Sequence, residues 1–137
     1  MPNTVFVIDT NVLISANLKP ASVSRQAYNK ALATGMLVRS AETLEEFARK
    51  IALAKFDKYL NPAEKARAIV RYRDESISVI PDISIAASPD LKDNMFLGLA
   101  VAAFADCIIS GDKKHLLSLH PFRGIPILSP ADFLKQF

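Results

Sequence analysis

Five short apolar segments recur along the chain, and polar-apolar patterns typical of helices separate them. The first segment, Thr4–Ile8, is rich in β-branched residues, and its apolar positions are continuous rather than alternating. Continuous apolarity predicts a strand that is buried on both faces, as in a parallel sheet. Four further segments are predicted to form strands: Met36–Val38, Ile77–Ile80, Cys107–Ile109 and Ile125–Leu128.

The intervals between these segments carry helix signals. Asn61, Pro62 and Glu64 form a typical helix start, because Asn caps, Pro suits the first turn and Glu stands at the third position. The predicted helices are Ser22–Thr34, Ala41–Ala54, Asn61–Glu75, Asp93–Phe104, a short one at Leu116–Leu117 and a last one that opens at Ser129–Pro130. Strands that alternate with helices predict an α/β fold, a three-layer α/β/α sandwich around a central, mostly parallel five-stranded sheet.

Composition narrows the class of protein. The 137 residues, half of them hydrophobic and 23% charged, fit one folded domain that spans residues 1–137. Cys107 is the only cysteine, which excludes an intrachain disulfide and a thiolate zinc cluster. The longest apolar run, Met95–Ala105, is shorter than the roughly 20 residues that span a bilayer, and no signal-peptide pattern opens the chain. We therefore expect a cytoplasmic protein with no membrane partner.

Four acidic residues follow the carboxyl ends of predicted strands, which is the edge where α/β sheets bind ligands. Asp9 is the most informative of them, because a carboxylate that ends a buried strand is costly unless it is paired or bound to a cation. Converging carboxylates repel one another, and Mg²⁺ or Mn²⁺ prefers such an all-oxygen environment. We expect a catalytic, metal-binding pocket formed by Asp9, Glu46, Asp93 and Asp112. Asn11, Asn94 and Ser110 are expected to support it through neutral oxygens and hydrogen bonds.

The residue inventory excludes several other chemistries and favours an anionic substrate. The four glycines stand too far apart for a phosphate-binding loop, and no Gly-x-Ser-x-Gly elbow exists. An acidic pocket that binds divalent cations can carry out phosphoryl chemistry. Residues 49–73 contain eight basic and two acidic residues, a net charge of +6 that suits a longer polyanion but is equally typical of a solvated helix face. The candidate RNA-binding residues are Arg49, Lys50, Lys55, Lys58, Arg67, Arg71 and Lys113.

Four segments together resemble the PIN domain family of metal-dependent ribonucleases, and above all the VapC-type toxins of bacterial and archaeal toxin–antitoxin pairs. These segments are Val7–Leu13, Ser40–Phe47, Asp90–Leu97 and Ile109–Leu117. The resemblance implies a PIN-like parallel sheet, Mg²⁺ or Mn²⁺, cleavage of single-stranded RNA that leaves a 5′-phosphate, a cognate antitoxin protein and, frequently, a homodimer. It makes Asp9, Glu46, Asp93 and Asp112 the metal-binding acids, with Asn11 and Ser110 in support. Ser110 stands where the family commonly has Thr, and it keeps the hydroxyl.

Other interpretations of these residues stay open from the sequence. Asp90 and Asp93 are also typical of a helix start, and Asp9 can cap a helix that begins near Thr10. Glu45 is the alternative to Glu46 as the second acid. The rival functions are a non-catalytic PIN-like module that binds RNA or protein, and an aspartyl-phosphate phosphatase. The phosphatase pattern is Asp-x-Asp, whereas this chain has Asn11 at the third position.

Overall fold

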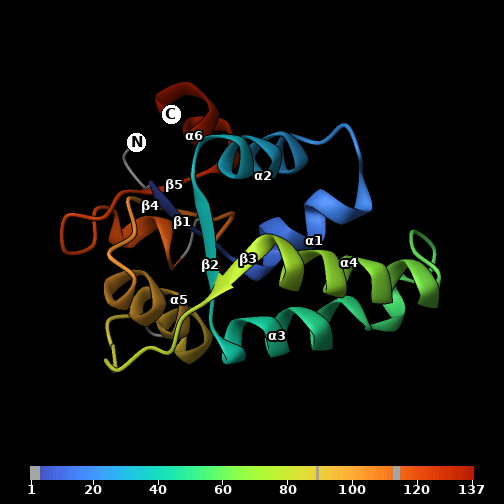
Figure 1. The fold of residues 1–137 in the computed structure, drawn as a ribbon, viewed down its shortest axis with the longest axis horizontal. Helices are drawn as coiled ribbons and strands as arrows, with labels where there is room; N and C mark the ends of the chain where they lie inside the picture. The colour runs from blue at the N-terminus through green and yellow to red at the C-terminus, as the bar shows by residue number, and fades with distance from the viewer. Residues whose placement is uncertain (1–3, 89, 113–114) are drawn as a thin grey trace.

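The computed structural model describes residues 4–88, 90–112 and 115–137, and within them five parallel strands form one sheet. The order across the sheet is β3-β2-β1-β4-β5, so that the first strand in the chain lies at the centre (Figure 1). The strands are β1 (Val5–Ile8), β2 (Met36–Arg39), β3 (Ser76–Ser78), β4 (Cys107–Ile109) and β5 (Ile127–Leu128). All four strand pairings are parallel, which confirms the predicted sheet.

Helices cover both faces of this sheet. They are α1 (Thr10–Leu18), α2 (Val23–Thr34), α3 (Ala41–Ile51), α4 (Pro62–Glu75), α5 (Leu91–Ala102) and α6 (Pro130–Gln136), with 3₁₀ turns at Ala54–Phe56 and Leu117–Leu119. Side chains alternate across β1: Phe6 and Ile8 pack with α1, α2, α3, α4 and α6, whereas Val5 and Val7 pack with α5. The three-layer α/β/α prediction is confirmed. In the part of the chain that the structure describes, no helix has the length and apolar composition needed to cross a membrane.

Several element boundaries differ from the sequence prediction for local reasons. Helix α5 begins at Leu91 rather than Asp93, because the Asp90 carboxylate caps it by accepting from the Lys92 N–H at 2.9 Å. Helix α3 ends at Ile51 rather than Ala54 and gives way to a separate 3₁₀ turn. Strand β5 is shorter than predicted, because Ile125 pairs with Phe122 across a tight turn instead of joining the sheet.

For helix α1 the sequence predicts only a start near Thr10. Its buried residues include Val12, Leu13 and Ile14 in direct succession, so its apolar positions do not form the single stripe that indicates a surface helix. The helix packs against α2 and α3. Helix α1 begins directly after β1, so its N-terminus lies at the carboxyl edge of the sheet.

Helix α5 ends in a Schellman turn whose left-handed position is occupied by Phe104. The Ala105 N–H donates to the Ala100 carbonyl at 2.9 Å, and Phe104 has φ of 53°. Glycine is favoured at this position because it lacks the Cβ that disfavours left-handed backbone. Phe104 is 87% exposed, so its ring gains little from burial.

We expect Phe104→Gly to raise the free energy of unfolding by about 1 kcal/mol, the cost of a left-handed non-glycine residue. Urea denaturation of both proteins measures the difference. Phe104→Ala is the matched control, because it removes the ring but keeps the Cβ, and it should bring no gain. A Phe104→Gly protein less stable than the parent would contradict the interpretation.

Candidate active site

Asp9 ends β1 and caps α1 at the same time. Its Oδ1 accepts from the Val12 N–H at 2.9 Å, and its Oδ2 accepts from the Ser110 hydroxyl at 2.5 Å and the Gly111 N–H at 3.3 Å. The residue is 3% exposed, and none of these donors is a cation. Burial outweighs the three hydrogen bonds and raises the pKa of Asp9 to about 6. The capping role is therefore present, but it leaves the charge of this carboxylate uncompensated.

Asp93 and Asp112 face each other from α5 and from the loop after β4. Burial and a hydrogen bond with Asp112 raise the pKa of Asp93 to about 7, while the Ser88 hydroxyl donates to Asp93 Oδ2 at 3.3 Å. Burial also opposes ionisation of Asp112, but hydrogen bonds from Asp93 and from the His115 N–H hold its pKa below the usual value. The contact thus shifts the pKa values of the two carboxyl groups in opposite directions, as expected for carboxyl groups that lie close together.

Ser110 connects this pair to Asp9. Its hydroxyl donates to Asp9 Oδ2 and accepts from the Asp112 N–H at 2.9 Å. Ser110 is fully buried at the end of β4. The hydroxyl therefore sets the position of Asp9 through its side chain and of Asp112 through its backbone.

Glu46 completes the set from the other side, on α3. The Thr10 hydroxyl donates to Glu46 Oε1 at 2.7 Å, and the residue is 6% exposed. Among the described residues, Oε2 is the one buried side-chain oxygen or nitrogen that has no hydrogen-bond partner. Glu45, by contrast, is exposed. The structure thus places Glu46, and not Glu45, in the pocket that Asp9 lines, because neighbouring helical residues point about 100° apart.

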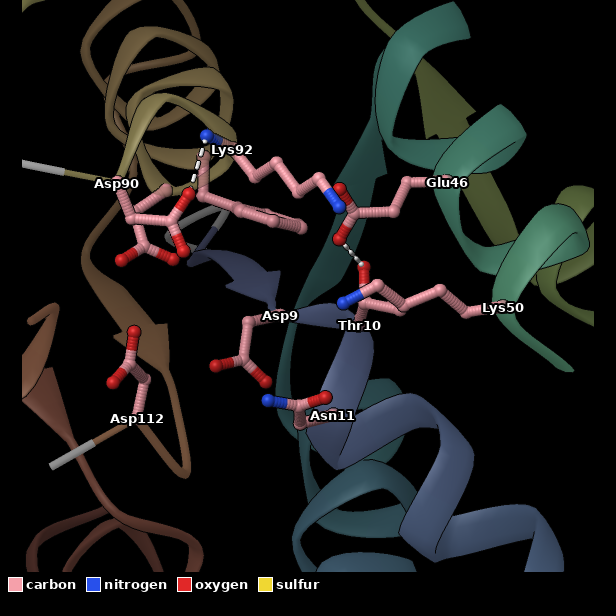
Figure 2. Close-up of a pocket in the computed structure, with 10 residues that line it drawn as sticks. Asp9, Thr10, Asn11, Glu46, Lys50, Asp90, Lys92 and Asp112 are labelled. Carbon is pink, nitrogen blue, oxygen red and sulfur yellow. Dashed lines mark hydrogen bonds between the residues drawn. The ribbon is translucent and has the colours of Figure 1, made fainter. Parts of the chain in front are cut away.

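All four acids line one pocket at the carboxyl edge of the sheet (Figure 2). The lining residues are Asp9, Thr10, Asn11, Glu46, Lys50, Asp90, Lys92, Asp93, Phe96 and Asp112. Figure 2 shows Asp90 and Asp112 on the side opposite Glu46 and Lys50, with Asp9 between them. Thr10, Asp90, Lys92 and Phe96 were not foreseen from the sequence. For Lys92 the sequence does offer a signal, because it stands next to Asp93 in the first turn of a helix.

The remaining predicted site residues are placed as follows. Asn11 lines the pocket, whereas the Asn94 amide binds the backbone of Ser88 through two hydrogen bonds and faces a different hollow. Of the candidate RNA-binding residues, Lys50 lines the pocket and Arg49 lines the adjoining hollow. Lys55, Lys58, Arg67 and Arg71 are exposed on the α3–α4 segment and line neither. Lys113 lies outside the described residues.

Two further residues of the basic segment serve packing. Lys65 is buried and forms an ion pair with Asp57 at 2.6 Å, so its charge is already compensated. Tyr72 is buried with its ring edge-on against Phe47 and is not placed for stacking on a base. The Lys65–Asp57 pair is neutral, so the net charge of +6 over residues 49–73 is carried by the other basic residues of the segment.

The donor chemistry of the pocket fits a hard divalent cation. Every candidate ligand is an oxygen, one buried carboxylate oxygen is unpartnered, and two buried carboxyls have raised pKa values that a cation would lower. Within residues 4–88, 90–112 and 115–137, no three acidic, histidine or cysteine side chains converge closely enough to hold one ion as they stand. The fit therefore rests on the donor set and the unpartnered oxygen.

Comparison with known proteins identifies the fold and the family. The model of the PIN domain matches residues 5–114. A solved structure of VapBC2 from Rickettsia felis bound to a DNA fragment from their promoter is similar, with a TM-score of 0.59, 13% identity, and 92% of this chain and 98% of that chain covered. A structure of VapBC-1 from nontypeable Haemophilus influenzae is similar with a TM-score of 0.61, 14% identity, and coverage of 93% and 99%. No curated protein sequence matches the chain significantly.

Proposed function

Because the chain belongs to the PIN domain family, we propose that it is a metal-dependent endoribonuclease that hydrolyses phosphodiester bonds of single-stranded RNA. The observation that carries the proposal is the pocket itself: four acids from separate elements line it, and one of their buried oxygens, Glu46 Oε2, has no partner among the described residues. Mutually repulsive buried carboxylates destabilise a fold, so a cation-dependent activity explains why they lie together.

We assign the residues the following roles. Asp9, Asp93 and Asp112 would hold Mg²⁺ or Mn²⁺, which activates water and stabilises the leaving oxygen of a displacement at phosphorus when it is bound. Ser110 keeps Asp9 and Asp112 in register, and Thr10 holds one oxygen of Glu46. The second oxygen of Glu46 is then free to complete the oxygen shell or to orient the attacking water. No side chain acts as a covalent nucleophile.

We further propose that the protein is the toxin of a toxin–antitoxin pair and that a cognate antitoxin binds it. The support is the shared fold: the two similar structures are described as VapBC assemblies, and this chain covers nearly the whole of each matched chain. Co-expression with the product of a small adjoining reading frame tests the pairing. Relief of growth arrest and co-purification of the two proteins are expected, whereas growth that is unaffected by the nuclease alone would count against a toxin.

The central experiment is incubation of the purified protein with end-labelled single-stranded RNA in Mn²⁺ and in EDTA. We expect internal cleavage, with 5′-phosphate products, only when the metal is present. The rival function is a non-catalytic RNA-binding module, which the lack of a ready three-acid cluster in the described residues favours. RNA that is bound but not cut, together with no Mn²⁺ binding by calorimetry, would establish the rival instead.

Glu46→Gln and Glu45→Gln form a matched pair that tests the second acid. We expect Glu46→Gln to reduce cleavage by about 100-fold, on the scale of losing one electrostatic group from an active site, because it replaces the unpartnered carboxylate oxygen in the pocket. Glu45→Gln should stay within about twofold of the parent, since its exposed side chain lies outside the pocket. Cleavage rates under saturating Mn²⁺ measure both. Equal losses in the two variants would contradict the assignment of Glu46.

A further inference from the structure

Two lysines line the acidic pocket from opposite helices. Lys92 stands in the first turn of α5 and Lys50 in the last turn of α3, and both line the same pocket as the four acids. Figure 2 shows the two side chains extending toward the side of the pocket that carries Glu46 and Thr10. The pocket therefore has an acidic side, with Asp90 and Asp112, and a side to which two ammonium groups extend.

Neither ammonium lies within ion-pair distance of an acid in the described part of the chain. The ion pairs in the described part of the chain are Lys65–Asp57 and Arg73–Asp74, and neither of them involves Lys92 or Lys50. Lys92 also lies in the first turn of α5, where the positive end of the helix dipole disfavours a cation. Its position is thus not explained by stabilisation of the helix, and its charge is available to an anion.

We propose that Lys92 and Lys50 form a subsite that binds one phosphate of the RNA, the phosphate adjacent to the one that is cleaved. This inference rests on the proposed nuclease function and names the substrate contacts that the acids themselves do not supply. Chain phosphates beyond the scissile one meet repulsion from the acidic side of the pocket, and the two lysines offer the compensating charge on the other side.

The positively charged side of the pocket, formed by Lys92 and Lys50, does not extend far beyond the pocket. The adjoining hollow shares Glu46 and Lys92 with the pocket and is lined further out by Arg49, but also by Glu42 and Glu45. Their carboxylates disfavour a continuous track of phosphates along α3. The geometry points to a single flanking phosphate, so each lysine should change the salt dependence of binding by about one unit and no more.

The test is steady-state cleavage by Lys92→Met, Lys50→Met and a control, Lys135→Met, whose exposed side chain lies on α6 outside the pocket. On an RNA oligonucleotide we expect each pocket variant to raise KM about tenfold with a smaller effect on kcat, and to reduce the salt slope by about one. On a dinucleoside monophosphate, which has no flanking phosphate, the variants should match the parent. Mn²⁺ affinity measured by calorimetry should be unchanged, which a merely structural role would not predict.

The inference is overturned if Lys92→Met lowers kcat with KM unchanged, if it affects both substrates equally, or if it behaves like Lys135→Met. Failure of the proposed function gives a different result, namely no metal-dependent cleavage by the parent protein. In that case fluorescence anisotropy with the same oligonucleotide decides the subsite. Binding about tenfold weaker in Lys92→Met than in Lys135→Met supports it, and equal binding in the two variants refutes it.

Discussion

Replacement of Asp9 by Asn is expected to reduce Mn²⁺-dependent RNA cleavage by at least about 100-fold and to leave the fold in place. Asn preserves the shape of the side chain and is itself a good helix cap, so the Val12 N–H keeps its acceptor. The neutral amide, however, is a much weaker ligand for a hard cation than a carboxylate. The ratio of kcat/KM values for variant and parent measures the loss.

Asp106→Asn is the matched control for this substitution. The Asp106 side chain accepts from the Val5 N–H at 2.8 Å at the start of β4, outside the pocket. The same chemical change there should leave cleavage within about twofold of the parent. Unchanged cleavage in Asp9→Asn, with Mn²⁺ at saturating concentration, would contradict the proposed centre.

The same Asp9→Asn substitution is expected to stabilise the metal-free protein at alkaline pH. In the folded protein the pKa of Asp9 is about 6, against 3.8 for an exposed Asp, because the carboxylate is buried. Between these two values the folded state keeps a proton that the unfolded state has released. Stability of the parent therefore falls as pH rises from about 4 to about 6, and the full penalty is present above that range.

Asn carries no charge and escapes this penalty. The pKa difference corresponds to roughly 3 kcal/mol, and the loss of one acceptor for Ser110 or Gly111 reduces the expected gain to about 1–3 kcal/mol at pH 8. At pH 3.5 the two proteins should be nearly equal. Urea denaturation in EDTA at both pH values measures the free energies of unfolding. A variant less stable than the parent at pH 8, or a difference in stability that does not change with pH, would show that burial of the charged Asp9 carboxylate does not destabilise the folded protein.

Addition of Mn²⁺ should reverse the order of stability at pH 8. A cation compensates the carboxylates of the parent and stabilises the folded state by mass action, while the Asn variant gains less. The pocket would thus be a case of the trade-off between stability and activity. The carboxylates that destabilise the metal-free protein are those that the proposed chemistry requires.

Local signals in the sequence determine much of the fold without tertiary information. The strand Cys107–Ile109 and the capped start of α4 at Asn61 have the bounds that the sequence indicates, because apolar runs and capping residues act over a few neighbouring positions. The order of acids along an α/β pattern also indicated that Asp9, Asp93 and Asp112 would meet, since the carboxyl ends of parallel strands share one edge.

Tertiary structure decided what local signals left open. Helix α1 is buried on several sides, so no single stripe marks it, and the choice between Glu45 and Glu46 depends on how α3 is rotated against α1. Asn94 and Lys92 are two residues apart in α5, yet the first binds the Ser88 backbone and the second lines the pocket. The sequence by itself determined which residue types lie near the edge of the sheet. Only packing decided which side chains point into the pocket, because side-chain direction is set by contacts between elements far apart in the chain.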